Sequence, residues 1–198
     1  GLSLVGSEMC IRDSLGAEVE IIEFLPRILP GMDAEIAKKF MTIARKQGLK
    51  FRLSTAVKSA KAGKNGVSLA VTSANGGVEE TIKADIALVS VGRHPATDGL
   101  GLEKIGVTMT PRGRIAVDAR FETSIEDIYA IGDVIDGPML AHKAEEDAVA
   151  AVEMMAGKPG HVDYDLVPGI VYTAPEIATL GKSEEALTEA GVDFAKGV

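Results

Sequence analysis

The hydrophobic pattern of the first part of the chain alternates between strand and helix. Residues 18–24 are a short run rich in β-branched side chains, which predicts a strand. Apolar side chains then recur at i, i+4 and i+7, which places Ile36, Phe40 and Ile43 on one face of a helix. Asp33, directly before this helix, is suited to cap it, and a second strand pattern follows. This order of strand, loop, helix and strand is typical of half a doubly wound nucleotide-binding unit.

Strand patterns dominate the next part of the chain. Three alternating segments, each bounded by turn residues, predict strands at residues 56–61, 67–72 and 78–83. The Asn-Gly-Gly turn at 75–77 predicts that the last two form a hairpin. Residues 85–92, DIALVSVG, are almost continuously apolar, which predicts a strand buried on both faces.

Helix and strand patterns both return in the second half of the chain. A helix is expected over residues 140–155, with Gly157 at its end. Strands are expected around Val171 and Ala178, and a capped helix is expected to begin near Ser183.

Composition narrows the class of protein. The 198 residues are 46% hydrophobic but only 4% aromatic, so a sizeable and mostly aliphatic core is expected, as in parallel-sheet α/β proteins. The net charge of −8 argues against nucleic acid and anionic membrane surfaces as partners. No apolar run approaches the roughly 20 residues of a membrane span, and no secretory signal is found. With Cys10 as the only cysteine, an internal disulfide is excluded and a cytoplasmic protein is expected.

Several motifs that occur in order along the chain carry a resemblance to a known family. They are VGRHPAT, RGRIAVD, YAIGD followed by GPMLAHKAE, and VYTAPEIATLGKSEE. In these motifs the chain resembles the flavin-dependent pyridine nucleotide–disulfide oxidoreductases, and among them the dihydrolipoyl dehydrogenases. The resemblance covers residues 15–198.

The resemblance implies a fold class and a division into domains. The fold is expected to be α/β: a three-layer FAD/NAD-linked reductase (Rossmann-like) fragment plus the start of an α+β dimerisation domain. Residues 15–92 would be a partial NAD-binding domain and residues 93–162 the C-terminal part of the FAD-binding (central) domain. Residues 163–198 would begin the dimerisation (interface) domain.

Residues 1–14 do not follow this pattern. The family has a G-x-G-x-x-G phosphate loop here, whereas the string LVGSEMCIRDS at 4–14 contains only Gly6, out of register. The string can be back-translated into a transposon-end adapter used in preparing DNA for sequencing. We therefore expect a non-native, adapter-derived segment joined to a truncated gene, and Cys10 then has no functional meaning. The alternative is a diverged natural helix.

Three residues are implied by the resemblance to contact NAD. Glu23 ends the first strand, where a carboxylate can accept hydrogen bonds from both adenosine ribose hydroxyls and repel the extra phosphate of NADP. Val57 would contribute backbone contacts near the adenine, and Gly92 would allow close approach of the nicotinamide half. Taken alone, Glu23 is an exposed acid at a strand end, Val57 an ordinary strand residue and Gly92 a turn.

The resemblance also implies a flavin site. Asp133, after a strand and a glycine, would accept a hydrogen bond from a ribitol hydroxyl of FAD; without the resemblance it would simply close a turn or cap a helix. The next helix would direct its backbone N–H groups and positive dipole end at the flavin pyrimidine oxygen. The residues at this helix start are Met139, Leu140, Ala141 and His142.

Other polar patterns along the chain have simpler interpretations than a functional site. His142 and Glu146 have i, i+4 spacing, but no second histidine or cysteine lies nearby, so a metal site is rejected. The acidic run at 145–147 is interpreted as a solvated or interface face. Arg27 is the only basic residue that would suggest NADP, and Ala148 stands where the family usually has a glycine.

The implied activity belongs to a longer parent protein. The family passes electrons from a dithiol through a C-x4-C disulfide and FAD to NAD⁺, and this chain has neither that cysteine pair nor a downstream His-Pro…Glu base. No catalytic residue is therefore assigned, and the chain alone is expected to be inactive and to bind FAD and NAD poorly. The implied partners are the lipoyl domain of 2-oxo acid dehydrogenase complexes and a second copy of the parent chain. The alternatives are a sister disulfide or mercuric reductase and a non-catalytic nucleotide-binding module.

Overall fold

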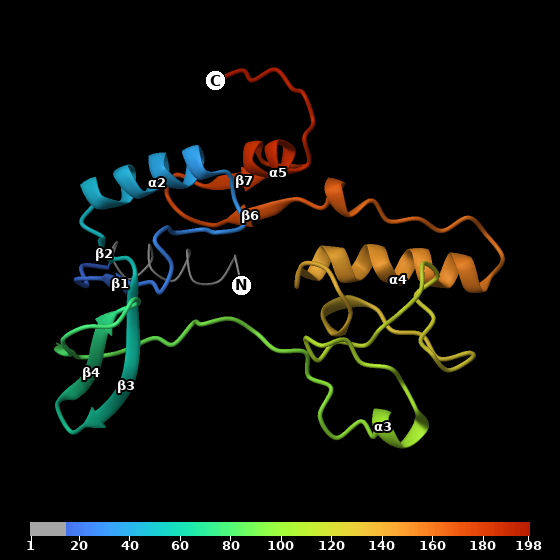
Figure 1. Ribbon diagram of the computed structural model, residues 1–198, viewed down its shortest axis with the longest axis horizontal. Helices are drawn as coiled ribbons and strands as arrows, with labels where there is room; N and C mark the ends of the chain where they lie inside the picture. The colour runs from blue at the N-terminus through green and yellow to red at the C-terminus, as the bar shows by residue number, and fades with distance from the viewer. Residues whose placement is uncertain (1–14) are drawn as a thin grey trace. The chain divides into compact units, whose positions relative to one another are not determined.

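The computed structural model describes residues 15–198 and divides them into two compact units (Figure 1). One unit consists of residues 91–167, and the other combines residues 15–90 with residues 168–198. The segment 1–14, expected to be non-native, and Cys10 within it lie outside the described residues.

The unit containing the early residues begins with the predicted strand, helix and strand. Strands β1 (Glu20–Ile22) and β2 (Lys50–Arg52) pair in parallel, and helix α2 (Ala34–Lys46) connects them. The carboxylate of Asp33 accepts hydrogen bonds from two backbone N–H groups in the first turn of α2, so the predicted N-cap is confirmed.

The buried face of α2 differs from the predicted one. Phe40 is buried as expected, but its companions in the core are Ala37 and Ala44. Ile36 and Ile43, which share the predicted apolar face with Phe40, retain 41% and 38% exposure, so this face as a whole is not the buried one. The small alanines let the helix backbone approach the strands closely, and this selects a stripe displaced by one residue from the one that the larger side chains suggested.

A three-stranded antiparallel sheet follows β2 and confirms the three strand predictions. Its order is β3-β4-β5, and β4 and β5 form the predicted hairpin across the Asn-Gly-Gly turn. The strands are β3 (Thr55–Gly63), β4 (Gly66–Ser73) and β5 (Glu80–Ala84).

The apolar run at 85–92 does not form the predicted buried strand. No strand is assigned there, and Ile86, Val89 and Val91 are 73%, 73% and 93% exposed. A strand buried on both faces needs hydrogen-bonded neighbours and covering layers. None of the sheets described in residues 15–198 provides a neighbouring strand for this run.

Residues 168–198 pack against α2. Val171 and Ile177 are buried in the same core as Phe40. The side-chain amide of Gln47, just after α2, donates to the carbonyl of Ala174 at 2.7 Å. This segment contains the predicted elements β6 (Gly169–Val171), β7 (Ile177–Thr179) and α5 (Glu184–Glu189).

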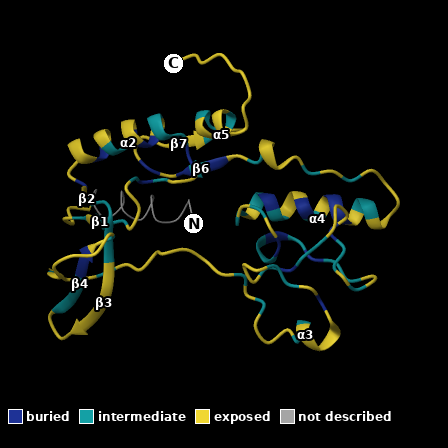
Figure 2. Cartoon of the chain, in the orientation of Figure 1, coloured by how far each residue is buried: buried dark blue, intermediate teal, exposed yellow. Residues whose placement is uncertain are grey.

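The unit of residues 91–167 is built around one long helix. Helix α4 (Ala141–Met155) confirms the prediction over 140–155, and Figure 2 shows a buried stripe along it. In this unit α4 packs against loops joined by isolated bridges, and no strand is assigned among residues 91–167. The shorter elements are α3 (Leu102–Ile105), η1 (Gly132–Val134) and η2 (Tyr164–Leu166).

The core of this unit is aliphatic apart from one phenylalanine, in line with the low aromatic content. Its buried members are Val107, Ile115, Phe121, Ala130, Ile135, Ala150 and Ala151. Within the part of the chain that the structure describes, no helix has the length and apolar character needed to cross a bilayer.

Candidate functional site

The turn η1 packs directly on helix α4 at a glycine. Gly132 is buried and has φ +74°, a left-handed conformation that side chains other than glycine rarely adopt. A Cβ atom at this position would lie 3.1 Å from the Cβ of Ala144. Glycine therefore allows both the turn and the close contact with α4, and Asp133 follows at once.

Arg93 connects two of the predicted flavin-site residues. Its guanidinium donates to the Oδ2 of Asp133 at 3.2 Å and also to the backbone carbonyl of Met139. The side chains of Asp133 and Arg93 are 43% and 47% exposed, so the carboxylate remains accessible beside its partner. Arg93 was not among the predicted site residues, although it lies in the VGRHPAT motif that carried the resemblance.

The start of α4 brings together the remaining flavin-site candidates. Leu140 is the N-cap residue in extended conformation, Ala141 is the first helical residue, and no side chain caps this end of the helix. His142 takes part in an interaction of its own. The first turn of α4, which no side chain caps, lies next to the Arg93 contact on the carbonyl of Met139.

A buried ion pair lies beneath this helix start. The Nζ of Lys143 and the Oδ2 of Asp147 are 2.7 Å apart, and both side chains have 0% exposure. The interpretation of residues 145–147 as a solvated or interface face was therefore wrong at Asp147, which is buried within its own unit, while Glu145 and Glu146 are exposed. An i, i+4 pair of charges is common on solvated helices, so its spacing alone could not reveal this burial.

Tyr164, near the C-terminal end of the same unit, also contacts the buried pair. Its hydroxyl donates to the Oδ1 of Asp147 at 2.8 Å, and the Nζ of Lys143 lies 5.4 Å from the centre of its ring. Burial, together with the hydrogen bond to Asp147, raises the pKa of Tyr164. The phenol therefore stays protonated and serves as a donor.

Glu23 lies at the C-terminal end of β1, as predicted. Its carboxylate accepts a hydrogen bond from the backbone N–H of Leu25 at 2.8 Å. Its backbone carbonyl accepts from the N–H of Thr55 at 2.9 Å, at the first residue of β3. Val57, two residues further along β3, is 48% exposed. The structure thus brings Glu23 close to the start of the strand that carries Val57.

Gly92 belongs to the other unit, residues 91–167. It has φ +119°, and a Cβ atom there would meet no atom within 4 Å. Of the three NAD candidates, Glu23 and Val57 therefore belong to one unit and Gly92 to the other.

The residues present suit FAD and NAD in their chemistry. Asp133 offers a partly exposed carboxylate to a hydroxyl group, and the uncapped start of α4 suits a polar flavin edge. Glu23 offers a carboxylate at the C-terminal end of a strand, where ribose hydroxyls bind in nucleotide-binding folds. Within residues 15–198, His, Cys, Asp and Glu do not gather in groups of three or more that could hold a metal ion.

Comparison with known proteins gives relatives along the whole chain. Residues 1–148 match the family model described as pyridine nucleotide-disulphide oxidoreductase. The chain is 52% identical over 198 residues to the mitochondrial dihydrolipoyl dehydrogenase of Pisum sativum and 47% identical over 200 residues to that of Homo sapiens. It covers 40% and 39% of these relatives, or about two-fifths of their length. The alignments include residues 1–14, and the adapter origin expected for that segment stays a prediction.

Solved structures with the same fold include flavoproteins. The LpdA structure from Mycobacterium tuberculosis has a TM-score of 0.84 and 25% identity, covering 94% of this chain and 40% of that one. The HOCl-induced flavoprotein disulfide reductase RclA from Escherichia coli has a TM-score of 0.80 and 29% identity, with 94% and 42% covered. The Rossmann-like α/β fold class is confirmed, and the chain belongs to the pyridine nucleotide–disulphide oxidoreductase family.

Proposed function

We propose that this chain is part of a dihydrolipoyl dehydrogenase, an enzyme that oxidises protein-bound dihydrolipoamide and reduces NAD⁺. The proposal rests on sequence identity. Over its whole length the chain is 52% identical to a plant dihydrolipoyl dehydrogenase and 47% identical to a mammalian one. The chain spans about two-fifths of those relatives, so the complete activity belongs to the full-length protein that contains this sequence.

Residues of the 91–167 unit would hold FAD, which when bound supplies two-electron exchange between a thiol pair and a nicotinamide. Asp133 would accept a hydrogen bond from a ribitol hydroxyl. Residues 139–142, at the uncapped start of α4, would direct backbone N–H groups and a positive dipole end at the pyrimidine edge. Arg93 supports this arrangement because it links the Asp133 carboxylate to the carbonyl of Met139.

In the other unit Glu23 would bind NAD⁺ through the adenosine ribose. Its carboxylate has an acceptor atom beyond the one that receives the Leu25 N–H, and its negative charge disfavours the phosphate of NADP. Val57 would contribute backbone contacts near the adenine, and Gly92 would leave room for the nicotinamide half. These three assignments rest on the family resemblance together with the position of Glu23 at the strand end.

The partners and location of the full-length protein follow from the same proposal. It would act as a homodimer on the lipoyl domain of a 2-oxo acid dehydrogenase complex. Its location would be the cytoplasm, or the mitochondrial matrix in a eukaryote, since the relatives from pea and human carry the designation mitochondrial.

A second candidate is a flavin reductase of the same family with a different electron acceptor. The leghemoglobin reductase of Glycine max is also 52% identical to this chain over 198 residues, so identity alone does not select the acceptor. The disulfide reductase RclA, at 29% identity, shares the fold as well.

The acceptor can be tested with the full-length protein. We expect dihydrolipoamide to reduce NAD⁺ rapidly, and NADH-driven reduction of ferric leghemoglobin, glutathione disulfide or mercuric ion to be far slower. A protein that binds flavin but prefers one of the latter acceptors would support the second candidate. A protein that binds no flavin would refute both.

A further inference from the structure

We propose that Lys143 and Asp147 are positioning residues that fix the turn at Gly132, and through it the Asp133 carboxylate relative to the start of α4. The inference rests on the proposed flavin site and adds two side chains that do not touch the cofactor. This positioning role would explain why the protein buries an ion pair whose desolvation costs free energy.

The pair holds both polar backbone groups of Gly132. The N–H of Gly132 donates to the Oδ2 of Asp147 at 2.9 Å, and its carbonyl accepts from the Nζ of Lys143 at 3.0 Å. The same two side-chain atoms are 2.7 Å apart, so one ion pair binds one peptide segment at two points. Two charge-assisted hydrogen bonds to a single residue define its orientation as well as its position.

Stability alone does not account for the pair. Lys143 and Asp147 are both 0% exposed, and removing two charges from water costs about as much as their attraction returns. Where no other group depends on it, a buried ion pair can often be replaced by apolar residues of similar volume without loss of stability. Here they would leave the N–H of Gly132, the first residue of η1 and left-handed, without the partner that it has in the structure.

The pair also reaches the loop that leads into α4. A Cβ atom on Gly137 would lie 3.0 Å from the Cε of Lys143 and 3.4 Å from its Nζ. The lysine stem therefore runs alongside the segment between η1 and α4. Lys143 is itself the third residue of α4, so it ties the first turn of the helix to the Gly132 carbonyl.

Tyr164 also binds the ion pair, and it lies outside the segment between Gly132 and the start of α4 that the pair fixes. Its hydroxyl occupies the second oxygen of Asp147 at 2.8 Å, which leaves Oδ2 directed at Gly132 and Lys143. Removing this hydroxyl should loosen Asp147 without removing either charge.

The test uses the full-length flavoprotein that contains this sequence and three variants, Lys143→Met, Asp147→Asn and Tyr164→Phe. The measurements are the FAD dissociation constant by fluorescence quenching, the visible circular dichroism of the bound flavin, and its midpoint potential. We expect the first two variants to weaken FAD binding by about tenfold or more, because small displacements of binding groups have effects of that size. We expect a more negative midpoint potential, since the displaced helix start stabilises reduced flavin less. Tyr164→Phe should show the same changes in smaller measure.

Two controls separate positioning from stability. Glu145→Gln removes an exposed carboxylate from the same helix and should change none of the three readouts. The double variant Lys143→Met/Asp147→Asn should weaken binding no more than the stronger single variant, because both act through Gly132.

Each outcome decides one proposal. If the variants melt at lower temperature but their bound flavin keeps its dichroism, potential and affinity, the pair is only structural and this inference is wrong. The proposed function then stands. If the unmodified protein binds no flavin, the proposed function fails first, and the inference fails with it.

Discussion

Gly132 combines a left-handed backbone with close packing against α4. Its φ of +74° excludes most side chains, and Ala144 lies 3.1 Å from the place where a Cβ atom would stand. We predict that Gly132→Ala destabilises the protein by about 1–2 kcal/mol from the left-handed backbone, with a further cost from the contact. Urea denaturation followed by circular dichroism measures the sum.

Gly113 provides the matched control. It has φ +73°, but a Cβ atom there would meet no atom within 4 Å. Gly113→Ala should therefore show the backbone cost alone, and adding Ala144→Gly to Gly132→Ala should recover part of the difference as a coupling energy. Equal losses for Gly132→Ala and Gly113→Ala would show that the contact with α4 contributes nothing.

At the residue scale, the sequence predicted Gly132 and Asp133. It did not predict the buried side chains that bind the backbone of Gly132. Gly132 and Asp133 lie next to each other in the chain, so one motif contains both. Lys143 and Asp147 act on Gly132 from more than ten residues away, through burial that only the folded packing creates. Local charge spacing cannot distinguish a buried pair from a solvated one.

At the scale of elements, α2 offers a test of its corrected face. Phe40 is 5% exposed within the core, whereas Ile43 is 38% exposed. We predict that Phe40→Ala costs about 3–5 kcal/mol of unfolding free energy, because it removes a large side chain and leaves a cavity. Ile43→Ala should cost well under half as much, since part of that side chain is already in water. If chemical denaturation showed a larger loss of unfolding free energy for Ile43→Ala than for Phe40→Ala, the buried face of α2 would be the one that contains Ile43.

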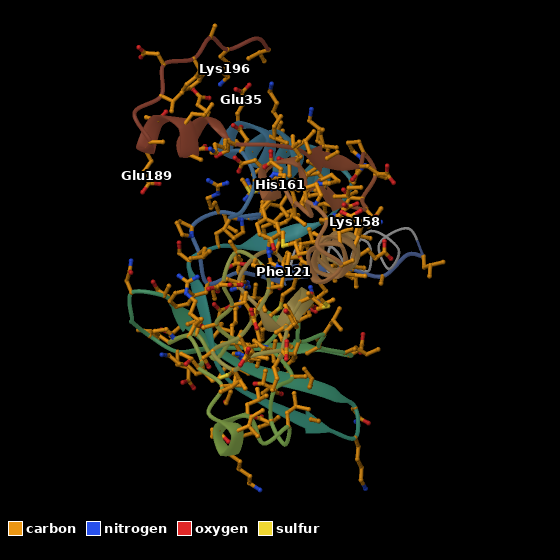
Figure 3. The ribbon with its side chains drawn as sticks, turned by 90° about the vertical axis from the view of Figure 1, so that its right-hand side faces the viewer. Glu35, Phe121, Lys158, His161, Glu189 and Lys196 are labelled. Carbon is orange, nitrogen blue, oxygen red and sulfur yellow. The ribbon has the colours of Figure 1, made fainter. Side chains whose placement is uncertain are left out.

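The junction of α2 with the C-terminal segment predicts an acid dependence. Hydrogen bonds from Lys196 and Lys39, reinforced by their charges, lower the pKa of Glu35 from 4.5 to about 2 (Figure 3). A carboxylate whose pKa is lower in the folded state stabilises the fold above its unfolded pKa and loses that effect on acidification. We therefore predict a fall in stability between pH 4.5 and 2 that Glu35→Gln reduces. Denaturation curves recorded at several pH values give the measurement.

Two comparisons make the acid prediction specific. Because Glu35 is partly exposed, high salt should weaken the effect. Glu189→Gln, in α5, should leave the acid dependence unchanged, since Glu189 takes part in none of the salt bridges found in residues 15–198. An identical pH profile for Glu35→Gln and the unmodified protein would contradict the proposed origin.

The sequence predicted the elements well where a local signal, such as a helix cap or a turn, determines them. Asp33 and Ser183 cap their helices as predicted, and the Asn-Gly-Gly turn joins β4 to β5. Residues 85–92 failed because an apolar run becomes a buried strand only if other segments supply hydrogen bonds and cover. That condition depends on tertiary packing and leaves no mark in the run itself.

At the scale of the whole molecule, the exposed apolar run has consequences for association. Residues 86–91, IALVSV, contain no proline and no charge, and Ile86 and Val89 are each 73% exposed. Extended segments of this kind pair readily with copies of themselves. We predict that Val89→Lys reduces concentration-dependent light scattering.

Val78 supplies the control for this prediction. It is 93% exposed but lies outside the apolar run, so Val78→Lys adds the same charge without interrupting the segment. Equal improvement from both variants would mean that net charge, and not the run, governs association.

The return of residues 168–198 to α2 makes one unit discontinuous along the chain, with residues 91–167 inserted between its two parts. During synthesis, residues 15–90 are made before residues 91–167, and the strands at 168–198 that pack against them are made last. Holding the two parts together across an unfolded insertion is entropically costly, and the cost falls when the insertion is already compact. Prior folding of the insertion therefore lowers the entropic barrier to completing the unit that surrounds it in sequence.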